Sequence, residues 1–287
     1  MVQNGVIRVG PAGWSYEDWQ GIVYSKAMRM KPLELLSVLF DVVEVNSTFY
    51  RPVSSHVSHQ WCRQVMGNPR FRFTVKVWRK FTHEIGTTVS RNERELFLSG
   101  LQPLLEKNLM GVLLAQFPWS FKRTRENRFR LGELVELFCG IPLAIEFRHA
   151  SWDVEEVYAE FRKRNLCFCS IDQPILRDSI SPTEEVTAPF AYIRLHGRNA
   201  ENWFKEGAGR DQRYDYLYTE EELQPWVDRA QRFVQQVEDV YIITNNHYSG
   251  KAVVNALELQ DMLGKERKHI PTELINKYPR LIKILSP

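Results

Sequence analysis

The sequence lacks several features that define large classes of proteins. Its 287 residues contain no run of 18 apolar residues, so we expect no membrane span and no membrane partner. The chain does not begin with a charged stretch followed by an apolar core, so no signal peptide is expected. Lys and Arg total 38 against 35 Asp and Glu, a balance too even to indicate nucleic acid by itself.

Cysteine is scarce, and its spacing fits no metal or redox motif. The four cysteines, Cys62, Cys139, Cys167 and Cys169, form no Cys-x-x-Cys pair. Cys167 and Cys169 lie two apart in an apolar stretch, which favours buried reduced thiols. Reduced thiols are typical of cytoplasmic proteins, so a cytoplasmic location is expected. No cofactor motif is found, and no cofactor is expected.

Short β-rich segments alternate with longer amphipathic ones. Strands are predicted at residues 6–10, 42–46, 71–77, 111–117, 142–147, 166–172, 190–197 and 240–246. Apolar stripes with helical spacing predict helices at residues 93–107, 131–139, 154–164, 221–237 and 251–263. Ser151 and Asp153 are cap candidates for one helix, and Thr219 with Glu222 resembles a capping box for another.

Eight strands alternating with helices predict a parallel sheet, and eight strands can close into a barrel. We therefore expect a single-domain α/β fold, a (β/α)8 TIM barrel over residues 1–264, with residues 265–287 as an extension packed on the barrel. An open doubly wound sheet is the alternative, but no Gly-rich nucleotide fingerprint follows the first strand. The polar segment 198–218 is either a lid or a plain surface loop.

Alternation along the strands separates an apolar face from an unusually polar one. We expect the apolar face to meet the helices and the polar face to point inward. By this rule Phe168, Ser170 and Asp172 point inward from one strand, and Thr244 and Asn246 from another. Because an unpaired buried charge costs several kcal/mol, inward charges must pair or line a wet pocket.

The charges of the polar face concentrate where the strands end, which is the catalytic end of a barrel. Arg8, Glu44 and Arg194 lie deeper and are expected to form an internal layer of ion pairs. The charges nearer the strand ends are expected to form a ligand site; they are Lys76, Glu146, Arg148, Asp172, His196 and Arg198.

Several short segments near the strand ends form a recognisable pattern. They are Gly13-Trp14-Ser15-Tyr16, residues 44–51, residues 71–76, Gln116-Phe117-Pro118, residues 146–149, residues 194–198 and Asn245-Asn246-His247. In this order they resemble the YecE-like family, also called domain of unknown function 72, over almost the whole chain. The resemblance implies a TIM barrel without an established activity. The chain departs from the family pattern at Trp119, where a second Pro is usual, and at Gln20, where an Arg is usual.

A small anionic ligand carrying phosphate or carboxylate is the partner that the polar face favours, because Arg and Lys bind such groups. The candidate ligand-binding residues are Glu44, Asn46, Lys76, Gln116, Arg148, Arg194, Arg198, Asn245 and Asn246. The candidate catalytic residues are Glu146, Asp172 and His196, which suit acid–base chemistry in a hydrolase, lyase or isomerase. Two narrower alternatives stay open. Glu44 and Glu146 form a glycosidase pair, or Asn245 and Asn246 only cap the helix predicted at residues 251–263.

Two other classes of function stay open. A divalent-metal hydrolase or isomerase would use Glu44, Glu146, Asp172 and His196, although no His-x-His or His-Glu-x-x-His pair is present and no metal site is expected. A nucleic-acid-binding protein would use the aromatic and basic segment 119–130, although nucleic acid is less favoured as a partner than a small anion.

Among variants, Glu146→Gln and Arg194→Ala are expected to impair ligand binding more than stability.

Overall fold

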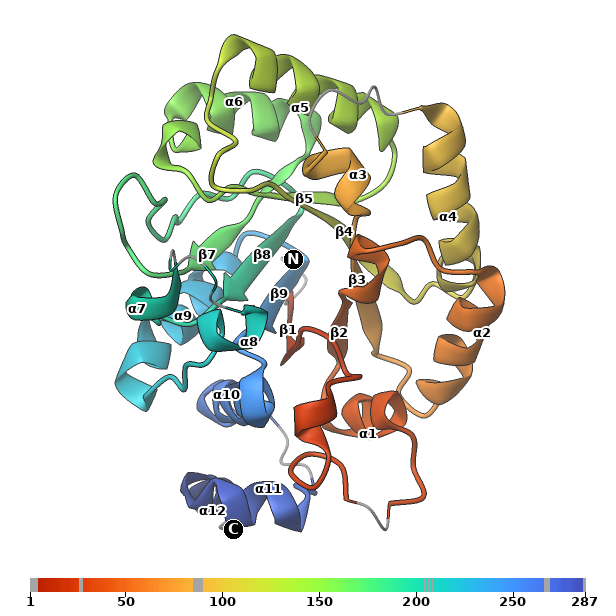
Figure 1. Ribbon diagram of the computed structural model, residues 1–287, viewed down its shortest axis with the longest axis vertical. Coiled ribbons are helices and arrows are strands. Elements are labelled where there is room, and N and C mark those ends of the chain that lie inside the picture. The colour runs from red at the N-terminus through yellow and green to blue at the C-terminus, as the bar shows by residue number, and fades with distance from the viewer. Residues whose placement is uncertain are drawn as a thin grey trace.

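Parallel strands surrounded by helices make up the protein in a computed structural model, which describes residues 5–25, 28–84, 90–203, 205, 207, 209–265 and 269–285 (Figure 1). The strands are β1 (Val6–Pro11), β2 (Val42–Val45), β3 (Arg72–Lys76), β4 (Met110–Gln116), β5 (Leu143–Glu146), β6 (Cys167–Phe168), β7 (Ser170–Asp172), β8 (Phe190–Leu195) and β9 (Asp239–Thr244). The α-helices are α1 (Pro32–Leu39), α2 (Ser55–Gln64), α3 (Arg79–Thr82), α4 (Arg91–Glu106), α5 (Arg125–Leu137), α6 (Glu155–Arg164), α7 (Ala200–Trp203), α8 (Arg210–Arg213), α9 (Glu220–Phe233), α10 (Lys251–Met262), α11 (Thr272–Lys277) and α12 (Ile282–Leu285).

The strands pair in two parallel sheets. One has the order β1-β9-β8-β7 and the other β2-β3-β4-β5-β6. An isolated bridge between Ala12 and Glu44 joins the two sheets, and the Gly13 N–H donates to the Glu44 carbonyl at 2.8 Å. The α/β class and the parallel pairing are therefore confirmed. The ladders of the described residues form two sheets, however, and not the continuous closed barrel that we expected.

Each predicted strand corresponds to an observed one, and the segment 166–172 holds two, β6 and β7, separated by Cys169. The five predicted helices are also observed, as α4, α5, α6, α9 and α10. Helix α5 begins at Arg125 and not at residue 131. The prediction missed its first turn because that turn is polar and carries no apolar stripe. Thr124 caps that turn by accepting from the Asn127 N–H.

One of the two cap predictions is confirmed. Thr219 accepts from the Glu222 N–H, and Glu222 accepts from the Thr219 N–H at 2.9 Å, which is the capping box at the start of α9. The prediction for α6 is wrong, because its cap residue is Val154 and no side chain caps the helix. Asp153 instead accepts from the Tyr158 hydroxyl at 2.5 Å.

The inward and outward faces of the segment 166–172 are the reverse of the prediction. Ile171 is the register partner of Arg194, and partners in a parallel pair share a face, so Ile171 points inward. Phe168 packs on α6, with its ring 4.9 Å from that of Tyr158, and Asp172 pairs with Arg198, which also pairs with Glu222 of α9. An aromatic ring and a carboxylate therefore face the helices here, while the apolar residues face inward.

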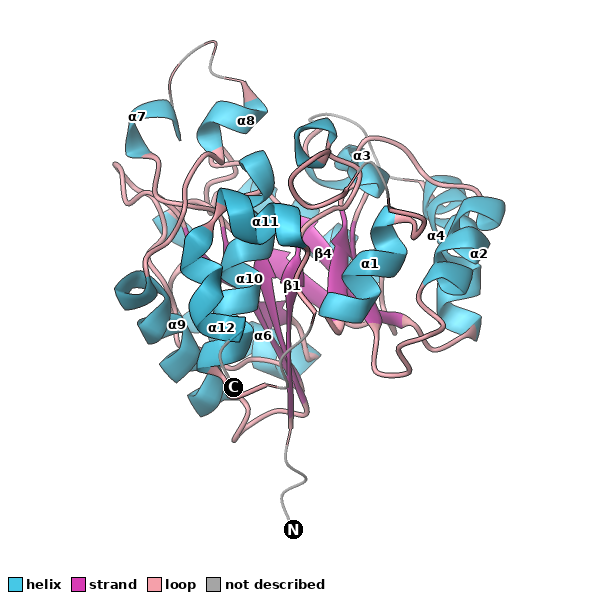
Figure 2. Cartoon of the chain, turned by 90° about the horizontal axis from the view of Figure 1, so that it is seen from below, coloured by secondary structure: helices cyan, strands magenta, loops and turns pink. Residues whose placement is uncertain are grey.

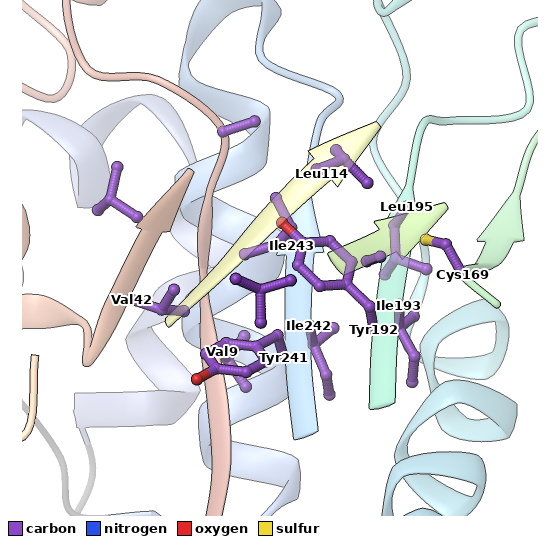
Figure 3. Packing of buried hydrophobic residues seen from close by; sticks show 14 of the residues in the cluster. Val9, Val42, Leu114, Cys169, Tyr192, Ile193, Leu195, Tyr241, Ile242 and Ile243 are labelled. Carbon is purple, nitrogen blue, oxygen red and sulfur yellow. The ribbon is translucent and has the colours of Figure 1, made fainter. Parts of the chain in front are cut away.

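The faces of β9 and the residues after it are likewise reversed. The Thr244 hydroxyl donates to the Ala252 carbonyl of α10 at 2.9 Å, and Asn246 donates to Asn255 of the same helix at 2.8 Å. Tyr241 points inward, where its ring lies 6.0 Å from that of Tyr192; both are labelled in Figure 3. The polar side chains at and after the end of β9 thus form hydrogen bonds with α10 and do not point into the interior.

Short helices gather at one end of the strands. In Figure 2, α3, α7 and α8 lie at the end opposite the N-terminus, beyond the carboxyl ends of the strands. The segment 198–218, predicted as a lid or loop, contains α7 and α8. In the extension, Tyr278 donates to the Ser249 carbonyl and Arg280 pairs with Glu258 of α10. Within the described ranges, no helix has the length and apolar character needed to span a bilayer.

Candidate functional site

Arg194, near the carboxyl end of β8, bridges two carboxylates from the other sheet. Its Nη2 donates to Glu44 Oε1 of β2 at 2.6 Å, and its Nη1 donates to Glu146 Oε2 of β5 at 2.5 Å. The Tyr192 hydroxyl of β8 donates a hydrogen bond to Glu44 Oε2 at 2.8 Å. All of these side chains are buried. Charges with such close partners can be buried at a tolerable cost.

Arg148 extends this network toward the end of β5. Its Nε lies 2.6 Å from Glu146 Oε1, and its Nη1 donates to Gln173 Oε1 at 3.1 Å. Although burial raises the pKa of Glu146, Arg148 and Arg194 hold it well below the usual range. Glu146 is therefore a carboxylate held by two guanidinium groups, and not a carboxylic acid ready to donate a proton.

His196 is neutral, and its neighbours fix which nitrogen carries the proton. Burial, reinforced by the charge of Arg148, lowers the pKa of His196 to about 3. Arg148 Nη2 lies 3.4 Å from Nδ1, and the Asn245 amide nitrogen lies 3.0 Å from the same atom. Because a guanidinium can only donate, Nδ1 accepts and the proton is on Nε2, 3.2 Å from Glu146 Oε1.

Lys76, at the end of β3, has an amide and an aromatic ring as its close partners. Its Nζ donates to Gln116 Oε1 at 2.7 Å and lies 4.1 Å from the centroid of the Phe49 ring. Burial, together with the charge of Arg194, lowers the pKa of Lys76 to about 7. The amine is thus divided between its charged and neutral forms near neutral pH.

A cavity of about 730 Å³ opens above this network, at the carboxyl ends of the strands. Its basic lining residues are Lys76, Arg79, Arg148, Arg194, Lys205 and Arg213. Its aromatic lining residues are Tyr16, Phe49, Tyr50, Trp119, Trp203 and Tyr214. No Asp or Glu is found among the described residues that line it.

The structure brings some of the predicted site residues to the cavity. Those that line it are Asn46, Lys76, Gln116, Arg148, Arg194 and Asn245. Glu44, Glu146 and His196 contact these residues from beneath and are buried. Arg8 does not join this layer as expected, because it pairs with Asp239, the first residue of β9, at 3.1 Å.

Three predicted site residues lie elsewhere. Asp172 accepts from Arg198 Nε at 2.9 Å, and Arg198 continues to Glu222 of α9. Asn246 donates to Asn255 inside α10 and to the Tyr216 carbonyl, so it is not the cap residue of that helix, which is Gly250. The reversed faces of β7 and β9 account for Asp172 and Asn246. Arg198 instead comes after β8, where Gly197 has a φ of 89° and strand alternation no longer applies. None of the three side chains lines the cavity.

Sequence reasoning missed cavity residues that follow the strands in irregular segments. Phe49, Tyr50, Arg79 and His83 come from residues after β2 and β3, where strand alternation no longer applies. Burial and the charge of Lys76 lower the pKa of His83 to about 4. The available signal was the position of aromatic residues just after strands, as at Tyr16 after β1 and Tyr50 after β2.

The observed geometry bears on the alternative functions. Among the described residues, no group of three or more His, Cys, Asp and Glu is placed to hold a metal ion. Phe121 of the aromatic and basic segment is buried, with its ring 5.4 Å from that of Trp152, so it offers no open surface for a base. Cys167 and Cys169 are buried free thiols, as expected, and burial raises the pKa of both.

The fold and the cavity define an α/β protein with parallel sheets and a basic, aromatic cavity beyond the carboxyl ends of its strands. Residues 8–280 match the family described as "Protein of unknown function DUF72", and the chain belongs to that family. The resemblance to domain of unknown function 72 found in the sequence is thereby confirmed.

Related proteins match along nearly their whole lengths. The UPF0759 protein YunF of Bacillus subtilis (strain 168) is 29% identical over 274 residues, which are 91% of this chain and 96% of that protein. The crystal structure of a DUF72 family protein, TM1631 of Thermotoga maritima MSB8, is 36% identical with a TM-score of 0.80, covering 90% of this chain and 99% of the other. A DUF72 family protein of Enterococcus faecalis V583, EF0366, is 24% identical with a TM-score of 0.81 over 93% and 98% of the two chains, and shows the shared fold alone.

Proposed function

We propose that the cavity binds a small anionic ligand that carries a phosphate or carboxylate group. The observation that carries the proposal is the composition of its lining, which has six basic residues and, among the described residues, no carboxylate. Cationic side chains that line a cavity attract anions and offer charged hydrogen-bond donors to them.

The architecture in this proposal is the eight-stranded (β/α)8 barrel. β6 and β7 count as one strand, since the Cys169 N–H between them donates to the Ile145 carbonyl of β5 at 2.9 Å. The bridge from Ala12 to Glu44 supports closure between β1 and β2. Ligands of barrels are bound at the carboxyl ends of the strands, where this cavity lies.

The buried network positions the cationic side chains of the proposed site. Within the buried network, Glu44 and Glu146 balance the charges of Arg194 and Arg148, so Lys76 in its protonated form adds a surplus positive charge. An anion beside Lys76 and Arg148 would neutralise that surplus. If the protein is an enzyme, hydrolase, lyase and isomerase chemistry remain the candidate classes, and Asp172 and Arg198 take no part because they lie outside the cavity lining.

The test is anion binding by the wild-type protein and by Arg148→Gln, with inorganic phosphate and glycolate as probes in isothermal titration calorimetry. Loss of a charged hydrogen bond of about 1.5–3 kcal/mol weakens affinity roughly tenfold or more. Arg63→Gln, at an exposed position of α2, is the matched control and should bind as the wild type does. The proposal is overturned if neither anion binds, or if Arg148→Gln binds both with unchanged affinity.

A further inference from the structure

Lys76 is placed in the cavity as an amine and not as one half of an ion pair. Its Nζ has Gln116 Oε1 at 2.7 Å and the Phe49 ring at 4.1 Å, and the described residues give it no carboxylate within ion-pair distance. It lines the cavity, so a ligand in the cavity can reach it. A lysine that served only as a fixed positive charge would gain from a carboxylate partner, which this one lacks.

The charged groups around Lys76 favour its neutral form. Arg194 and Arg148 face it from β8 and from the end of β5, His83 lies beyond β3, and the opposing carboxylates Glu44 and Glu146 are already bound to the two guanidinium groups. Burial and Arg194 lower the pKa of Lys76 to about 7. A neutral lysine amine in a closed site is a nucleophile, whereas an ammonium group is not.

We infer that Lys76 forms a Schiff base with a small carbonyl compound that also carries a carboxylate or phosphate group. The inference rests on the proposed anion site and adds the reactive group of the ligand. Arg148 supplies the contact for the anionic group, because its guanidinium lines the same cavity and is also held against the Trp203 ring at 5.4 Å.

The atoms of this step balance without any oxidant or reductant. The lone pair of Nζ attacks the carbonyl carbon, and the new C–N bond gives a carbinolamine. The C–O bond then breaks and a C=N bond forms, and the carbonyl oxygen leaves as water with both protons of the amine. Gln116 accepts a hydrogen bond from Nζ and so orients the amine toward the cavity.

The test is reductive trapping of the full-length protein with glyoxylate and sodium borohydride, followed by peptide mass spectrometry. We expect the adduct at Lys76, at least tenfold above that at any exposed lysine, with a trapping rate that rises to half its maximum near pH 7. Lys76→Met should lose this adduct, and Lys163→Met, at an exposed position of α6, should retain it. The mapped wild-type adduct decides the result even if Lys76→Met does not fold.

Glycolate distinguishes the two proposals, since it has the same carboxylate as glyoxylate but a hydroxyl group in place of the aldehyde. If glycolate binds in the cavity and glyoxylate labels only surface lysines, the Schiff base is overturned and the anion site stands. If neither compound binds nor labels the cavity, both proposals are overturned. Labelling at Lys76 that is suppressed by excess glycolate supports both.

Discussion

Arg194 contacts two buried carboxylates, so a neutral residue at this position leaves the charges of the network unbalanced. The sequence suggested that Arg194→Ala would affect ligand binding more than stability, but the burial of Glu44, Glu146 and Arg194 alters that expectation. We now expect Arg194→Ala to lower the free energy of unfolding by about 3–5 kcal/mol, because buried Glu44 loses its cationic partner and buried Glu146 keeps only Arg148 of its two guanidinium partners. Urea denaturation at pH 7 measures this change.

A matched variant at the surface provides the comparison for Arg194→Ala. Arg162 forms ion pairs with Glu155 and Glu185, and all three side chains are exposed. Arg162→Ala should cost about 1 kcal/mol or less. Equal losses for the two variants would contradict the conclusion that the buried network stabilises the protein.

At the scale of single elements, the start of α9 depends on one hydroxyl group. Thr219 accepts from the Glu222 N–H, and Thr219→Ala should lower the free energy of unfolding by about 1 kcal/mol. Gln231→Ala, at an exposed position of the same helix, should change it by about 0.5 kcal/mol or less. Thermal denaturation of both variants tests the prediction, which fails if Thr219→Ala is as stable as the wild type.

The elements also show how far the sequence could predict this fold. Strand positions follow from local patterns and were found throughout, whereas only five of the twelve α-helices of the described residues were predicted. Which face of a strand points inward was predictable where polar residues pair across the interior, as Glu44 and Arg194 do. The prediction failed where polar residues serve a neighbouring helix, as Asp172 and Thr244 do. Alternation alone does not distinguish these two environments, because both satisfy buried polar groups.

The candidate site was predictable only where it is built from strand ends. Lys76, Arg148 and Arg194 were identified because strand alternation extends to them, and Gln116 because it belongs to the family segment Gln116-Phe117-Pro118. Tyr214, which lines the cavity from a segment after β8, was not, because no periodic pattern fixes the path of an irregular segment.

For the whole molecule, two neutral histidines, the buried His196 and the partly buried His83, make stability depend on pH. The pKa of His196 is lowered to about 3 and that of His83 to about 4, against 6.5 when unfolded. Below pH 6.5 the unfolded chain therefore binds protons that the folded chain does not, so stability falls as pH decreases from about 6.5 to 4. The melting temperature should fall across this range, and His196→Gln should make its pH dependence shallower; the same slope in the variant would contradict the prediction for His196.

Arg194 belongs to one sheet, and both of its carboxylate partners belong to the other. Arg194, which lines the cavity, and the two carboxylates beneath it therefore also join the two sheets. During evolution, a substitution that removed one of these charges would leave the buried network unbalanced. The three positions can therefore be replaced together far more easily than one at a time. We therefore expect Glu44, Glu146 and Arg194 to be retained or replaced together among related sequences.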